Sequence, residues 1–237
     1  MLVSDSVNKG LIERVADLLD MDIAPSSSTH PTKGQIQSWL RDGYVRTVEL
    51  LEKDVLDEIF NTPSGSDGVM QLSVATINST SVTYDFVVND PIIEMVDING
   101  YATTNSIEFL HVLGVHENDS AGTTREYKEV KNIRTVQTSW TKGVGYWSRL
   151  PNGFIAIKIG SAPSDSDVKI VLAAIPDFST DGTIISERIA PLLSKFAFAT
   201  AQYQDEDEQS SLVNMKDFYQ EISILNRRFD KNAKLPD

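Results

Sequence analysis

The chain has 237 residues, with 34 acidic and 21 basic side chains, a formal net charge of −13 and no cysteine. The lack of cysteine excludes disulfides, thiolate metal sites and thiol nucleophiles. The negative charge argues against sequence-tolerant binding to a phosphate backbone, which depends on Lys and Arg. No stretch reaches the roughly 18 uninterrupted apolar residues of a membrane helix, and the first residues lack the apolar core of a signal peptide. We therefore expect no membrane partner, and a chain that folds in reducing cytoplasm or in a particle assembled there.

Helical spacing of apolar residues governs residues 1–61. A short helix is predicted from about Val7 to Asp20, followed by a linker of Pro, Ser and Thr over residues 25–31. Thr32, with Gln35 three residues later, forms a capping-box signature. Beyond it, apolar residues recur every three or four positions and predict one continuous helix of about seven turns, lined by Ile36, Leu40, Tyr44, Val48, Leu51, Val55 and Ile59.

The middle of the chain, residues 62–176, is rich in β-branched residues separated by turn signals. Such spacing predicts short antiparallel strands in a sandwich or small barrel. The predicted strands are Val69–Ile77, Val82–Val88, Ile92–Ile98, Ile107–Val115, Lys128–Val136, Tyr146–Leu150, Phe154–Ile159 and Val168–Ala174.

Residues 177–237 return to helical spacing. Pro191 suits the first position of a helix, and Asp205 with Glu208 three residues later resembles a second cap at the start of the last helix. That helix is predicted to bury one apolar stripe, formed by Leu212, Met215, Tyr219, Ile222, Leu225 and Phe229.

The order of helical, β and helical segments predicts an α+β fold with two domains. Residues 1–61 and 177–237 form a helical bundle, because neither group alone has enough partners to bury its stripes. Residues 62–176 form an inserted antiparallel β-sandwich or barrel module.

Signatures of catalysis and of metal or cofactor binding are weak. His111 and His116 are five residues apart on or beside a predicted strand, so they point to opposite faces and do not chelate one metal. Gly143-Val144-Gly145 lacks the third glycine of a dinucleotide-binding loop. Acidic pairs such as Asp165 with Asp167 lack the spacing of a calcium-binding loop. We expect no catalytic residues, no metal and no cofactor.

One segment is basic although the chain is acidic. Between residues 125 and 149, cations outnumber acids and aromatic residues lie among them. Three interpretations stay open: a contact face for an acidic copy of the same chain, a nucleic-acid interface, or a solvated strand face without a special role. The candidate subunit- or tail-contact residues are Arg125, Lys128, Lys131, Arg134, Trp140 and Trp147.

Several segments resemble the head-to-tail adaptor proteins of tailed phages. The helix around residues 36–43 (Ile-Gln-Ser-Trp-Leu-Arg-Asp-Gly) resembles their early helix, and residues 146–176 resemble their later β segment. Residues 191–199 and 215–229 resemble the closing helical pair of the family. The resemblance covers most of the chain at the level of layout.

The resemblance implies a structural virion protein of the phage neck. Such adaptors (connector or head-completion proteins) form a ring, usually of twelve copies, under the portal vertex of the capsid. Their helical bundles surround a channel for double-stranded DNA, which passes without sequence-specific binding. Their β module points outward or toward the tail or nozzle proteins. A C-terminal extension reaches the portal protein, and here its candidate contact residues are Arg227, Arg228, Phe229, Lys231 and Lys234.

The leading hypothesis is therefore a non-enzymatic ring adaptor at the head–tail junction, with acidic walls that repel phosphate and let DNA slide. Two alternatives remain. A β-sandwich recognition module of a tail or fibre would bind protein or stack exposed Trp140, Tyr146 and Trp147 on sugars. An acidic hydrolase would need two carboxylates at catalytic separation across a cleft.

Overall fold

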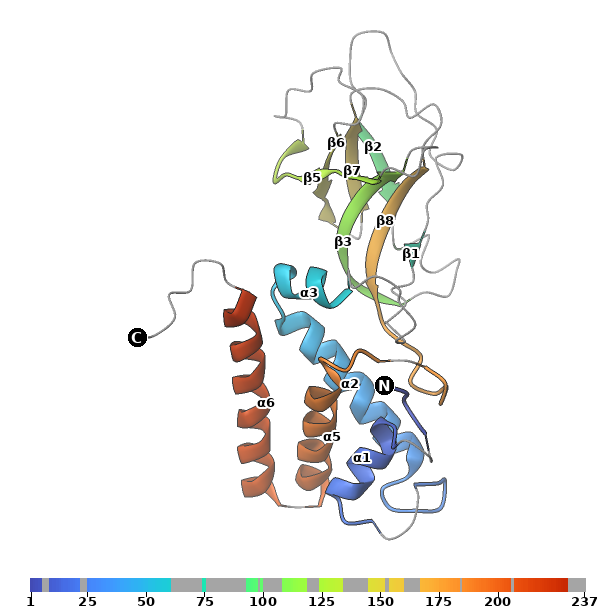
Figure 1. The fold of residues 1–237 in the computed structure, drawn as a ribbon, viewed down its shortest axis with the longest axis vertical. Helices are drawn as coiled ribbons and strands as arrows, with labels where there is room; N and C mark the ends of the chain where they lie inside the picture. The colour runs from blue at the N-terminus through green and yellow to red at the C-terminus, as the bar shows by residue number, and fades with distance from the viewer. Residues whose placement is uncertain are drawn as a thin grey trace, which may run out of the picture. The chain divides into compact units, whose positions relative to one another are not determined.

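The computed structural model describes residues 1–5, 9–21, 25–60, 74–75, 93–97, 99, 108–118, 124–133, 145–151, 154–159, 167–183, 185–205 and 207–229. The chain divides into two compact units, one made of residues 1–71 and 175–237 and the other of residues 72–174. The first contains the named helices and the second the named strands, so the fold is α+β (Figure 1).

Five helices make up the described part of the first unit. They are α1 (Leu11–Leu18), α2 (Lys33–Leu50), α3 (Lys53–Phe60), α5 (Ala190–Gln204) and α6 (Glu208–Phe229).

The predicted capping box of α2 is confirmed: the Thr32 hydroxyl accepts a hydrogen bond from the Gln35 backbone N–H at 3.2 Å, and the Gln35 side chain accepts one from the Thr32 N–H at 2.8 Å. Pro191 lies in the first turn of α5, where its missing N–H leaves no helical bond unmade.

The predicted seven-turn helix is wrong, because the chain breaks between α2 and α3. Leu51 has an extended backbone with ψ of 137°. The side chain of Asn226, on α6, bridges the break: its Nδ2 donates to the Leu50 carbonyl at 2.9 Å, and its Oδ1 accepts from the Glu52 N–H at 3.0 Å. The apolar stripe continues across the break because Leu51, Val55 and Leu56 are all buried, so periodicity alone did not reveal it.

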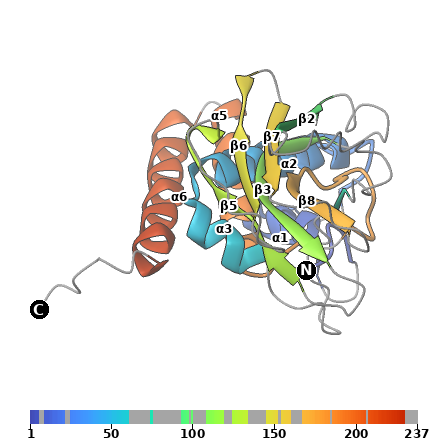
Figure 2. The same ribbon diagram turned by 90° about the horizontal axis from the view of Figure 1, so that it is seen from above.

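Helix α5 packs against α1, α2 and α6, and therefore lies at the centre of the helical unit (Figures 1 and 2). The approach to α2 is close: a Cβ added at Gly43 would lie 3.0 Å from the Phe196 ring. On the other side, the Phe196 ring meets Phe218 of α6 edge to face, with ring centroids 5.2 Å apart. An aromatic layer from α5 and α6 thus forms part of the core.

The described strands of the second unit form two sheets of four strands each. One has the order β1 (Val74–Ala75), β8 (Asp167–Ala174), β3 (Phe109–Asn118) and β4 (Thr124–Glu126). The other has the order β2 (Ile93–Asp97), β7 (Phe154–Ile159), β6 (Gly145–Arg149) and β5 (Lys128–Glu129). All the pairings are antiparallel except the short β5–β6 pair. Of the predicted strands, Val82–Val88 lies outside the described residues.

Buried side chains from both sheets form the interior of the β unit. Those that are almost fully buried include Val115, Tyr127, Trp147, Ile155, Ile157 and Ile170. Gly145 is required by this packing, because a Cβ there would lie only 2.5 Å from the Tyr127 ring. This explains the glycine before Tyr146 and Trp147 as a steric requirement.

Candidate functional site

Helix α6 begins at a cap that differs from the predicted one. The carboxylate of Asp207, not that of Asp205, accepts a hydrogen bond from the Ser210 N–H at 3.2 Å. Hydrogen bonds from the Ser210 hydroxyl and from this N–H hold the pKa of Asp207 below its usual value. Acidic Glu208 then occupies the first turn of α6, and basic Arg227 and Arg228 the last. This order of charges complements the helix dipole at both ends.

One face of α6, its inner face, packs on α5. Phe218 and Ile222 are buried there, and the Ser211 hydroxyl donates to the Ala199 carbonyl at 2.7 Å. At the margin of this face, Lys195 forms an ion pair with Glu221. The inner face fixes how α6 is rotated about its own axis.

The predicted buried stripe of α6 is therefore wrong in part. Ile222 is buried as expected, but Leu212 is 71% exposed and Tyr219 is 40% exposed. The side chain of Phe229 lies outside the described residues. The physical reason is the position of Phe218, which packs on Phe196 and lies on the helix about 100° from Tyr219. The prediction merged two neighbouring apolar stripes into one.

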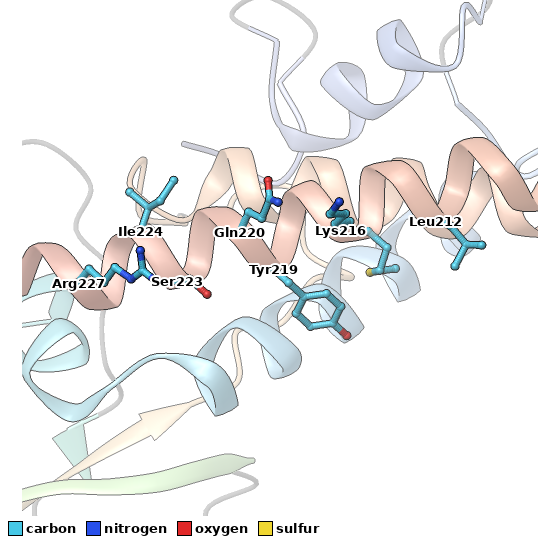
Figure 3. A pocket seen from close by; sticks show the side chains of 8 residues that line it. Leu212, Lys216, Tyr219, Gln220, Ser223, Ile224 and Arg227 are labelled. Atoms are coloured by element: carbon cyan, nitrogen blue, oxygen red, sulfur yellow. The ribbon is translucent and has the colours of Figure 1, made fainter. Parts of the chain in front are cut away.

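The second stripe lies on what we call the α6 outer face (Figure 3), whose labelled side chains all come from this one helix. A hollow on this surface is lined by Leu212, Met215, Lys216, Tyr219, Gln220, Ser223, Ile224 and Arg227. Ile224 is 48% exposed. Spacings of three and four residues place these side chains on one side of the helix. The outer face thus combines exposed apolar side chains with two cations and no acid.

A shallow groove between α2 and α6 adjoins the outer face and shares Met215 and Tyr219 with it. The guanidinium of Arg46, on α2, lies 5.8 Å from the centroid of the Tyr219 ring. A hydrogen bond with Tyr219 is the main cause of the raised pKa of Arg46. Arg46 also pairs with Glu49 at 3.6 Å. Tyr219 is therefore held in place from the α2 side while its ring stays partly open to solvent.

The candidate portal-contact residues are only partly described. Arg227 and Arg228 are exposed on the last turn of α6, and Phe229 is its last residue. Lys231 and Lys234 lie outside the described residues. Arg227, one of the described members of this group, also lines the hollow on α6.

The structure describes only part of the basic segment of the β unit, and one of its residues is buried. Lys128 and Lys131 are exposed, and Arg125 lies in β4 opposite Glu117. Arg134 and Trp140 lie outside the described residues. Trp147 is wrong as a contact residue, because it is only 1% exposed and belongs to the interior.

Arg149 is a cation of the basic segment that forms contacts within the β unit. Its guanidinium lies 5.5 Å from the Trp147 ring centroid, donates to Glu129 Oε1 at 2.9 Å and donates to the Val112 carbonyl at 2.9 Å. Within β6, Trp147 and Ser148 are both buried, so the indole belongs to the interior of the β unit. The glycan-binding alternative therefore loses Trp147 as a stacking platform.

Among the described residues, no group of three or more His, Asp or Glu is placed to hold a metal ion. His30 lies 3.8 Å from Asp205, and both side chains are largely exposed. No described helix is both long enough and apolar enough to cross a membrane. No protein-family model matches the chain, and a search of curated proteins also gives no match.

Proposed function

We propose that this chain is a structural subunit of a tailed-phage virion, an oligomeric ring adaptor that links the portal vertex of the capsid to the tail and lines the DNA channel. The observation that carries the proposal is the α6 outer face. Apolar side chains on a long surface helix are typical of subunits that bury them against another protein. The layout supports the same proposal, because both ends of the chain contribute to one unit and the β unit is inserted between them.

Each part of the chain has a role in this proposal. The helical unit acts as the ring-forming bundle, and the β unit, as a sandwich or barrel, contacts tail or nozzle proteins. Arg227 and Arg228 sit on an exposed helix end, which suits a contact with the portal protein. The net charge of −13 repels phosphate and lets double-stranded DNA pass without binding.

The proposal is tested by mixing the purified chain with purified portal rings and weighing the complexes by mass photometry. We expect a complex heavier than the portal by a ring of subunits. The double variant Arg227→Glu, Arg228→Glu should lose this complex, whereas Arg14→Glu, an exposed change on α1, should keep it. A chain that binds neither the portal ring nor an assembled neck contradicts the proposed function.

A further inference from the structure

The break between α2 and α3 has no local cause in the sequence. Residues 48–56 contain no Gly, Pro, Ser, Thr or Asn, which commonly end one helix or cap the next. The residue before α3 is Glu52, which is not a preferred N-cap, and Asp54 lies within the first turn instead. The Leu, Glu and Lys residues across the break are strong helix formers. A local preference that disagrees with the fold is expected at a functional or strained site.

One side chain from α6 replaces two backbone hydrogen bonds that the break removes. In a continuous helix, the Glu52 N–H would donate to the Val48 carbonyl. The Leu50 carbonyl would accept from the Asp54 N–H. Here the carboxamide of Asn226 takes both roles, because its Oδ1 accepts from Glu52 at 3.0 Å and its Nδ2 donates to Leu50 at 2.9 Å. A residue 174 positions away from Glu52 therefore stabilises the broken form.

A continuous helix would keep the apolar stripe on one side. Val48, Leu51 and Val55 are buried and follow one another at steps of three and four, so they would share one side of a straight helix. Glu49 would lie four residues before Lys53, which is the favourable order for an acid and a base on a helix. The straight form would lose the packing of α3 against α6. The position of α6 therefore decides between two ordered forms of the same segment.

We propose that the α2–α3 break is a conformational switch: Asn226 holds the broken form, and its removal from the break lets residues 33–60 join into one helix. The end of α6 lies beside α3 (Figure 1). Exposed Arg227 and Arg228 follow Asn226 directly, so a contact at this end of α6 acts on the residue that holds the break. Because α3 is the last described helix before the β unit in the sequence, joining it to α2 changes the direction in which the chain leaves the helical unit.

The switch goes beyond the proposed adaptor function and does not depend on it, because it acts within the helical unit of one chain. Any event that moves Asn226 away from the break favours the continuous form. By thermodynamic linkage, the continuous form in turn weakens a contact that needs the end of α6 in its present place. The switch is therefore tested in the free chain, without portal.

The test measures the NMR Cα chemical shift of Leu51, which reports backbone conformation. Leu51 is extended, with ψ of 137°, and a helical residue has a Cα shift on the other side of the random-coil value. Asn226→Ala removes both hydrogen bonds at the break and should raise the ratio of continuous to broken form by about tenfold or more. The Leu51 shift should then move from extended toward helical values. Thermal unfolding checks that the variant folds, and Asn226→Ser, whose side chain is too short to bridge the break, repeats the measurement if it does not.

Asn214→Ala is the matched control. The Asn214 side chain also joins α6 to its neighbour, because it donates to Gln202 Oε1 of α5 at 2.6 Å. It lies about 18 Å from Asn226 along the helix axis at 1.5 Å per residue. Asn214→Ala should leave the Leu51 shift unchanged.

Glu52→Pro tests the switch from the other side. Proline cannot occupy a helix interior, and it favours ψ of about 120–160° at the residue before it, which includes the value of Leu51. The double variant Asn226→Ala, Glu52→Pro should therefore return the Leu51 shift to its extended value. A helical Leu51 in the double variant overturns the proposal.

Two results for Asn226→Ala also overturn the proposal. An extended Leu51 shift in the folded variant would mean that other contacts fix the break. A random-coil shift would mean that the segment has no second ordered form. Neither result bears on portal binding, which is measured separately.

Discussion

The two faces of α6 are built from similar residues but have opposite environments. Phe218 on the inner face is fully buried, whereas Tyr219, the next residue, is 40% exposed. A step of one residue turns a side chain by about 100° around a helix. The neighbour that α6 packs on therefore decides which large side chains stabilise the folded chain and which remain available to a partner. Apolar character alone does not distinguish the two roles.

The largest effect that separates the two faces is expected from truncating one aromatic ring. Phe218→Ala removes a ring that packs edge to face on Phe196, and a cavity of this kind costs about 3–5 kcal/mol of unfolding free energy. Leu212→Ala, on the outer face, should cost less than about 0.5 kcal/mol, because Leu212 is 71% exposed. Urea unfolding followed by circular dichroism measures both. Similar losses of unfolding free energy for the two variants would show that Phe218 is not on the face of α6 that packs on α5.

Asn226 lies between the two faces of α6 and forms the hydrogen bonds that connect α6 to the break between α2 and α3. Its substitution tests whether these bonds stabilise the break. Asn226→Ala removes the hydrogen bonds to Leu50 and Glu52 and leaves two backbone groups without these partners. The expected cost is about 1–3 kcal/mol, again measured by urea unfolding. Arg228→Ala, two residues further along α6 and exposed, is the control and should change stability by less than about 0.5 kcal/mol. If Asn226→Ala were equally harmless, the break would not depend on α6.

Two features that depend on local chemistry were predicted from the sequence. Apolar spacing predicts a last helix that ends near Phe229, and Thr32 with Gln35 predicts the capping box of α2. The α2–α3 break was missed because its partner, Asn226, is 174 residues away from Glu52. No local pattern contains that information.

The candidate site was predicted less well, for the same physical reason. The helical stripe that contains Leu212 and Tyr219 predicts that both are buried. Two stripes fit the same helix, however, and only the contact with Phe196 selects one. Phe218 was the missing signal: a stripe through Ser211, Phe218 and Ile222 is as regular as the one proposed. In the β unit, the cations near Trp147 in the sequence predict an exposed indole, but Trp147 is buried. Strand alternation permits either face, and only the pairing of β6 with its neighbours turns this indole inward.

Thr47 is a buried polar residue in the interior of the helical unit, and its substitution tests the cost of a hydroxyl without a hydrogen bond. It lies on α2, and its hydroxyl is fully buried without a hydrogen-bond partner among the described residues. Thr47→Val keeps the shape of the side chain and removes the unsatisfied group, so unfolding free energy should rise by about 1 kcal/mol. Thr47→Ser keeps the hydroxyl and removes a methyl group, and should lower stability. A loss of stability in Thr47→Val would indicate that the hydroxyl has a role in the folded chain.

The smallest expected effect concerns the end of α6 where the inner and outer faces both begin. Hydrogen bonds from Ser210 lower the pKa of Asp207 in the folded chain, so its carboxylate stabilises the fold above the unfolded pKa of about 3.9. That contribution is lost as the pH falls through the lower, folded pKa. Between about pH 5 and pH 2, the urea midpoint should therefore fall less in Asp207→Asn than in the parent chain, because the amide oxygen still accepts the cap hydrogen bond but does not titrate. Asp217→Asn alters an exposed carboxylate in the middle of α6 and serves as the control. If the urea midpoint depended on pH in the same way in both variants, the Asp207 cap would not be the cause of the pH dependence. The position of α6 would then be set by its contacts with α5 rather than by the hydrogen bonds of its first turn.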